Sequence, residues 1–133
     1  MWAGALSRMV LAGFLAGTAA YTQTAKPVAG AAELKRADQL FRSGSAAFAA
    51  GNLSDAHKDF DSLVHLVPRI STAHTAYGVV LLAEGQLLAA VTELETARKL
   101  DPNDVRAAIN LGVAYRRLDQ NEKSVQAFSS AAN

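Results

Sequence analysis

Cysteine is absent from this chain of 133 residues. Its absence excludes disulfide bonds, thiolate metal sites, a cysteine nucleophile and a lipid-bearing cysteine at the N-terminus. An excess of one charge is also missing, because 13 basic residues face 12 acidic ones. This balance gives no strong field that would attract nucleic acid or an anionic membrane surface. Half of the residues are nevertheless hydrophobic, which is typical of a folded protein.

The common catalytic motifs are missing as well. The chain has no G-x-S-x-G nucleophile elbow, no phosphate-binding glycine loop and no H-E-x-x-H zinc motif. His57 and Asp61 lie four residues apart on one expected helix and could supply two metal ligands, with His65 two turns further on. Three groups on one helix do not form a metal site, so we expect surface histidines here. We predict no catalytic residue, metal or cofactor.

The first 20 residues differ in composition from the rest. Arg8 is their only charged side chain, and residues 9–20 read MVLAGFLAGTAA. These residues span about 18 Å as a helix, too short for a hydrocarbon core of about 30 Å. A basic flank, a short apolar run and small residues before Ala20 are typical of a signal peptide cleaved near that position. We therefore expect export, to the periplasm or beyond the cell. An uncleaved membrane anchor facing the envelope, extended by Trp2–Leu6, is the alternative.

Residues 21–32 read YTQTAKPVAGAA and are interrupted by Pro27 and Gly30. They show neither helical nor alternating periodicity, so a flexible linker is expected. The range 33–133 then has the apolar spacing of helices.

A period of 34 residues runs through this helical range. Small residues recur at two positions of each unit: Gly44, Gly78 and Gly112 at the first, and Ala56, Ala90 and Ser124 at the second. A glycine inside a helix costs about 1 kcal/mol relative to alanine, so its recurrence requires a packing reason. We expect close helix crossings at these residues, with larger side chains filling the space between successive pairs: Phe60, Leu94 and Phe128.

The pattern predicts six helices, at about 34–50, 53–67, 72–84, 87–100, 104–118 and 122–132. Gly51 and Gly85 break the first two pairs, and Pro68 and Pro102 separate successive pairs. The expected N-cap residues are Asn52 or Ser54 in the first unit and Asn121 in the third, and the segment 101–104 is expected to supply both the stop of one helix and the cap of the next.

The residues that carry the period resemble the tetratricopeptide repeat pattern, W-x2-L-G-x2-Y, then A-x3-F, then P. In the second unit the matching positions are Tyr77, Gly78, Leu81, Ala90, Leu94 and Pro102. The resemblance implies an all-α, right-handed solenoid of three helix-turn-helix hairpins, at about 37–70, 71–104 and 105–133, after a signal-like helix and the linker. It also places His74 in the tryptophan column, where it would pack against the neighbouring unit.

In this family the first helix of each pair lines a concave groove that holds a protein partner. By resemblance, the groove here is lined by Phe41, Ser45, Phe48, Thr75, Val79, Leu82, Arg106, Ile109, Val113, Arg116 and Arg117. Spacings of three and four within each unit fit one helical face. The predicted surface is apolar over two units and basic at its end. It suits an amphipathic helix or extended apolar segment with a carboxylate near the arginines.

The best-understood ligand of the family is the acidic C-terminal tail of cytosolic chaperones. It is held by lysine and asparagine on the first lining helix, asparagine on the second, and lysine and arginine on the third. Those columns here hold Phe41 and Ser45, then Ala76, then Arg106 and Asn110. Only Arg106 has suitable chemistry, so we do not expect this chain to bind a chaperone tail.

The sequence thus favours a non-catalytic scaffold or adaptor of the cell envelope that binds a protein or peptide, with no nucleic acid. Membrane association would come through the N-terminal segment. The alternative is a self-associating assembly factor or structural subunit of a membrane or secretion complex, anchored by its N-terminal helix. No further helix follows the third unit before Asn133, so its outer face could mediate a homo-oligomer or continue into a longer array.

Overall fold

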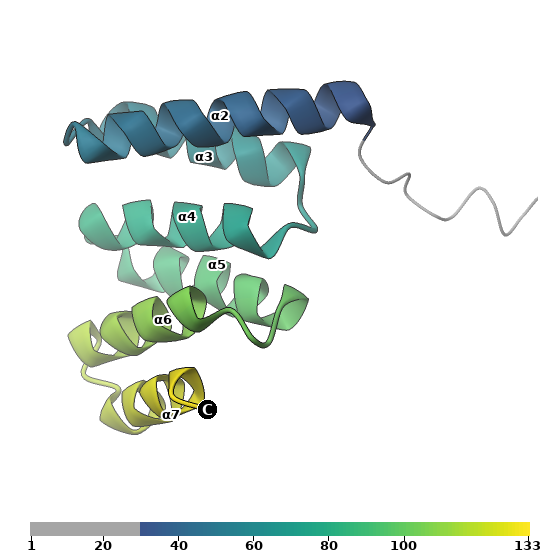
Figure 1. The fold of residues 1–133 in the computed structure, drawn as a ribbon. Helices are drawn as coiled ribbons and strands as arrows, with labels where there is room; N and C mark the ends of the chain where they lie inside the picture. Colours follow the sequence, from purple (N-terminus) through teal and green to yellow (C-terminus); the bar gives the residue numbers. More distant parts are fainter. Residues whose placement is uncertain (1–29) are drawn as a thin grey trace, which may run out of the picture. The chain divides into compact units, whose positions relative to one another are not determined.

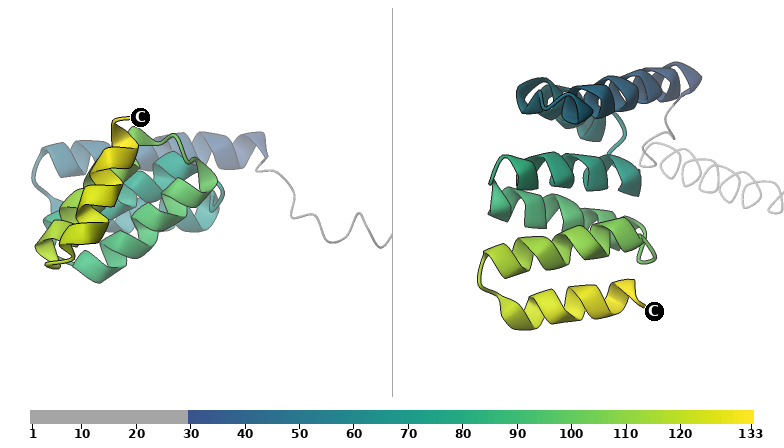
Figure 2. Two further views of the ribbon diagram at one scale, coloured as in Figure 1. Left: turned by 90° about the horizontal axis from the view of Figure 1, so that it is seen from below. Right: turned by 60° about the vertical axis from the view of Figure 1, so that its left-hand side comes forward.

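A computed structural model describes residues 30–133, which contain helices and no strand. The helices are α2 (Ala31–Ala49), α3 (Leu53–Leu66), α4 (Ser71–Ala83), α5 (Leu87–Leu100), α6 (Val105–Arg117) and α7 (Asn121–Ala131). They pair into three hairpins, α2–α3, α4–α5 and α6–α7, and each hairpin stacks on the one before it (Figures 1 and 2). The predicted all-α solenoid of three hairpins is confirmed. Residues 1–29, with the expected signal peptide or anchor and most of the linker, lie outside the described residues.

The helix boundaries follow the sequence closely, with two exceptions. Helix α2 begins at Ala31, so the linker prediction is wrong for residues 31 and 32. Residues 31 and 32 are alanines, which are strong helix formers, so the helix extends back to the residue after Gly30. The end of the linker was predicted from the lack of apolar periodicity, which located it less well than this glycine. Asn121 is also not the N-cap of α7, because Gln120 takes that place without a capping side-chain bond.

The turn inside each hairpin has one geometry. The residue two positions after the last helical residue has a positive φ: 77° at Gly51, 79° at Gly85 and 58° at Asp119. In each turn the next amide bonds back to a carbonyl five residues earlier, as Gln86 N does to Leu81 O at 2.8 Å. This is the Schellman motif, which favours glycine. Asp119 adopts the same left-handed conformation, which aspartate tolerates better than most residues.

The N-caps differ between the hairpins. Asn52 caps α3 by accepting the Asp55 amide at 3.2 Å, and Asp104 caps α6 by accepting the Ala107 amide at 2.9 Å. Asn52 is one of the two residues predicted to cap α3, and Asp104 belongs to the segment 101–104 that was predicted to supply the cap of α6. Ile70 occupies the N-cap position of α4 and makes no side-chain cap bond. An aliphatic residue at this position costs about 1 kcal/mol relative to a capping residue.

The recurring glycines lie at the helix crossings, as predicted. A methyl group built on Gly78 would lie 2.6 Å from Leu94 Cγ, and one on Gly112 would lie 2.7 Å from the Phe128 ring. The same group on Gly44 would lie 3.0 Å from Phe60. Larger side chains therefore fill the space that each glycine leaves open. Each glycine and the large side chain that it contacts belong to the same hairpin. The prediction that these large side chains fill the space between successive hairpins is therefore wrong.

Hydrogen bonds between polar side chains join successive hairpins. The phenol of Tyr77 donates to Asp61 Oδ1 at 3.3 Å and lies 3.1 Å from His57 Nε2. The other ring nitrogen of His57 lies 2.8 Å from Glu84 Oε2. Burial, together with the Asp61 carboxylate, raises the pKa of Tyr77 to about 12, so the phenol stays neutral. His57 is therefore part of the interface between hairpins, and the prediction that it is a surface histidine is wrong.

His74 is buried between two acceptors and packs against the preceding unit, as predicted. Its Nδ1 lies 2.7 Å from Glu93 Oε2, and its Nε2 lies 2.9 Å from the carbonyl oxygen of Pro68. A carbonyl oxygen and a carboxylate both accept hydrogen bonds, so the site suits the imidazolium form, in which both ring nitrogens donate. The hydrogen bond to Glu93 raises the pKa of His74, against the opposing effect of burial.

This arrangement predicts that the protein loses stability as the solution becomes alkaline. A folded-state pKa above the unfolded value of 6.5 stabilises the fold below pH 6.5 and ceases to do so as pH rises through the folded pKa. We expect His74→Ala to lower the free energy of unfolding by about 2 kcal/mol at pH 6 and by less at pH 9. Urea titrations at both pH values measure this. The exposed His65→Ala is the control, and equal losses for His74→Ala at both pH values would contradict a charged ring.

Candidate partner-binding face

The first helices of the hairpins, α2, α4 and α6, lie on the same side of the stack (Figure 1). We call this side the groove face. Helices α4 and α6 pack directly against one another along it. Because the repeat is 34 residues long, equivalent side chains on these three helices form rows across the face. The rows decide which side chains a partner could reach.

Most of the predicted groove residues are accessible on this face. Exposed side chains are those of Phe41, Arg106, Ile109, Arg116 and Arg117, and half-buried ones are those of Ser45, Phe48, Val79 and Val113. Their role in partner binding stays a prediction.

Two of the predicted groove residues are core residues instead. Thr75 is 3% exposed and Leu82 is 6% exposed. The hydroxyl of Thr75 donates to Asp104 Oδ2 at 2.7 Å, so the cap of α6 covers it. The central hairpin has neighbours on both sides, and the helical spacing of Thr75 and Leu82 does not reveal this. Neither side chain is available to a partner in this structure.

The basic end of the face comes from α6. Arg106 and Arg116 are exposed and form no ion pair within residues 30–133. Arg117 donates from Nη1 to the carbonyl oxygen of Leu82 at 2.7 Å, which ties the end of α6 to the end of α4. The two free guanidinium groups could bind carboxylates of a partner.

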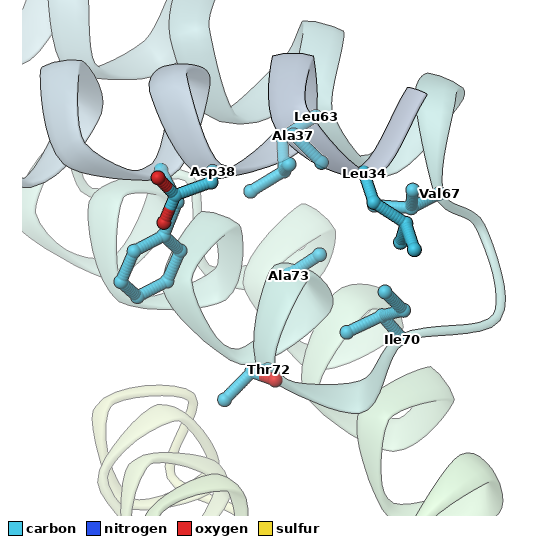
Figure 3. Close-up of a pocket in the computed structure, with 9 residues that line it drawn as sticks. Leu34, Ala37, Asp38, Leu63, Val67, Ile70, Thr72 and Ala73 are labelled. Atoms are coloured by element: carbon cyan, nitrogen blue, oxygen red, sulfur yellow. The ribbon is translucent and has the colours of Figure 1, made fainter. Parts of the chain in front are cut away.

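An apolar pocket opens at the other end, between α2 and α4. It has a volume of about 350 Å³ and is lined by Leu34, Ala37, Asp38, Phe41, Leu63, Val67, Ile70, Thr72 and Ala73. Figure 3 shows Leu34 of α2 and Ile70 before α4 pointing toward one another, with Ala37 and Ala73 to their left in this view. Sequence reasoning found Phe41 but missed Leu34 and Ile70. The available signal was an isoleucine at an expected helix start, where the next unit has Asp104.

Within residues 30–133 no three histidine or acidic side chains gather in a way that could hold a metal ion. No helix in this part of the chain has the length and apolarity needed to cross a membrane. The polar side chains of His57, His74 and Thr75 serve contacts between helices.

Comparison with known proteins assigns the family. The tetratricopeptide repeat model matches residues 41–94 and 81–133, which together cover most of the chain. The chain therefore belongs to the tetratricopeptide repeat family. No curated protein sequence is similar enough to count as a relative.

Solved structures agree on the fold. The TPR2B domain of yeast Sti1, solved as a pHsp70 complex, has a TM-score of 0.71 at 18% identity, covering 73% of this chain and 78% of that domain. The Arabidopsis OM64 TPR domain has a TM-score of 0.73 at 17% identity, covering 74% and 82%. MamA from Desulfovibrio magneticus, solved from residue 41 to its end, has a TM-score of 0.67 at 19% identity, covering 70% of this chain and 52% of that chain. These identities support a shared fold and nothing finer.

Proposed function

We propose that the chain is a non-catalytic module that binds a protein or peptide on its groove face. One observation carries the proposal: exposed apolar residues share the groove face with arginines that form no ion pair within residues 30–133. Ile109 and Arg106 lie on α6, and the pocket lies beside α2. Contiguous apolar surface bordered by charge is typical of a protein interaction site. The peptide complexes solved for other repeat domains of this fold support peptide binding by this chain, at the level of analogy.

Capture from the native cell extract tests this function. The full chain, an Arg106→Glu/Ile109→Glu variant and a Leu88→Glu control serve as baits, and bound proteins are quantified by mass spectrometry. Leu88 is exposed on α5, outside the groove face. Leu88→Glu therefore introduces the same change as Ile109→Glu, an exposed apolar side chain replaced by a carboxylate, at a site away from the groove. We expect proteins enriched by the native chain and the control to fall at least tenfold with the groove variant. Equal recovery by all three baits would contradict a groove function.

We further propose that the module works in the cell envelope. The support is the sequence of residues 1–20 alone, with its basic flank and short apolar run. The mass of the native protein tests it, since cleavage after Ala20 leaves a chain that begins at Tyr21. A chain that retains residues 1–20 in the membrane fraction would favour the anchored alternative.

The self-associating assembly subunit remains the second candidate, and one side chain favours it. Val125 on α7 is exposed, and its equivalent one repeat period back is the half-buried Val91. Two periods back is His57, which contacts the following hairpin. Val125 thus lies where a further helix would stack. Sedimentation at micromolar concentration should show oligomers that Val125→Lys abolishes, and a strict monomer would argue against this role.

A further inference from the structure

Ile70 occupies a position where helix capping would favour a different residue. It lies 34 residues before Asp104, which caps α6 and binds the hydroxyls of Ser71 and Thr75. Ile70 makes no such bond at the start of α4. Its side chain is 38% exposed and turned into the pocket. The residue contributes an apolar surface to the pocket in place of a cap.

Three large apolar side chains gather at this pocket. Leu34 is 47% exposed, Phe41 is 37% exposed, and Ile70 lies across from Leu34 (Figure 3). Phe41 is held edge-on against the buried Phe60, with ring centroids 5.9 Å apart. The volume of about 350 Å³ lies at the lower end of the range for ligand pockets. One or two bulky side chains, rather than a large cofactor, fit this space.

Charge beside the pocket defines the rest of the ligand. Asp38, Thr72 and Arg106 are separated by the 34-residue period and form one row across α2, α4 and α6. Asp38 is paired with Arg42 at 2.9 Å, whereas Arg106 forms no ion pair within residues 30–133. Packed helices lie about 8–10 Å apart, so Arg106 is about one helix spacing from Thr72 at the pocket rim. An unpaired guanidinium at that distance favours a carboxylate.

We propose that the pocket between α2 and α4 is the anchor site for a bulky aliphatic side chain of a partner segment. That segment carries an acidic residue about 10 Å from the anchor, which pairs with Arg106. The proposal rests on the proposed groove function and adds the identity of the anchor and the position of the charge.

Peptide selection tests the chemistry directly. A displayed library of random 12-residue peptides is selected on the full chain, and enriched peptides are measured by fluorescence polarisation. We expect a shared aliphatic residue with Asp or Glu several positions away. We expect Ile70→Asp to weaken binding at least tenfold without lowering the melting temperature, since the new carboxylate can cap α4 as Asp104 caps α6.

Charge reversal gives an independent check. Arg106→Glu should also weaken binding at least tenfold, and replacing the acidic peptide residue by lysine should restore binding to this variant. No enriched peptides, enriched peptides without acidic residues, or equal binding to Ile70→Asp would overturn the proposal. Self-association that Ile70→Asp abolishes would also overturn it, by showing a second copy in the pocket. Capture of extract proteins that is lost with the Arg106→Glu/Ile109→Glu bait but kept with an Ile70→Asp bait would support the groove function and overturn the anchor site.

Discussion

Replacing Gly78 by valine is expected to lower the free energy of unfolding by about 3 kcal/mol, at the upper end for an overpacked core. A Cβ at this position would lie 2.6 Å from Leu94 Cγ and 2.8 Å from its Cδ2. Leu94 is completely buried, so its branch point has no free space into which to move. The crossing of α4 and α5 would have to open, and with it the middle of the stack. Urea denaturation followed by circular dichroism measures the loss.

Two further variants separate the clash from helix propensity. Ala83→Val, at the exposed end of α4, should cost less than about 1 kcal/mol, because it changes propensity without a clash. Leu94→Ala alone should cost about 2–5 kcal/mol through the cavity it leaves. Combined with Gly78→Val it should cost clearly less than the sum, since valine fills part of that cavity. Additive losses would show that the two residues do not meet as described.

The architecture could be read from the sequence because its determinants are local and repeated. A glycine in the middle of a helix is unfavourable in isolation, and three of them at one period require close backbone approach. Turn glycines and prolines then fix the hairpins, so most helix boundaries agree with the structure within a few residues. The prediction failed at the start of α7, where the N-cap is Gln120. Glutamine is not a typical capping residue, so the sequence favoured the neighbouring Asn121.

The groove face was harder to predict, because burial there depends on the neighbouring hairpin. Phe41, Thr75 and Ile109 are equivalent by repeat period, yet only Thr75 is buried. Asp104 covers Thr75 through a hydrogen bond, whereas the equivalent of Asp104 above Phe41 is Ile70, which leaves a pocket. A spacing of three and four residues identifies the face of a helix and does not show what lies across from it.

Replacing Asp104 by alanine is expected to destabilise the protein about as much as Gly78→Val does, lowering the free energy of unfolding by about 3 kcal/mol. The carboxylate caps α6 through the Ala107 amide at 2.9 Å, which is worth about 1 kcal/mol. It also accepts from Ser71 at 2.9 Å and from the buried Thr75. Leaving the Thr75 hydroxyl without an acceptor adds about 1–3 kcal/mol. Asp101→Ala, an exposed change in the same loop, should cost much less.

A double replacement and a pH series test whether Asp104 acts through these bonds. Thr75→Val removes the orphaned hydroxyl, so Asp104→Ala/Thr75→Val should lose less stability than the two single losses combined. Burial raises the pKa of Asp104, but the hydrogen bonds from the Ala107 amide, Thr75, Ser71 and the Arg106 amide outweigh it and hold the pKa below its ordinary value.

The lowered folded-state pKa makes the effect of Asp104→Ala depend on pH. Asp104 stabilises the fold above its unfolded pKa of 3.8, and this stabilisation is lost as pH falls through the lower folded value. The difference in unfolding free energy between the native chain and Asp104→Ala should therefore be full at pH 6 and shrink below pH 4. A difference that stays constant down to pH 2 would mean that the charge of this carboxylate does not join the hairpins, and only its shape matters.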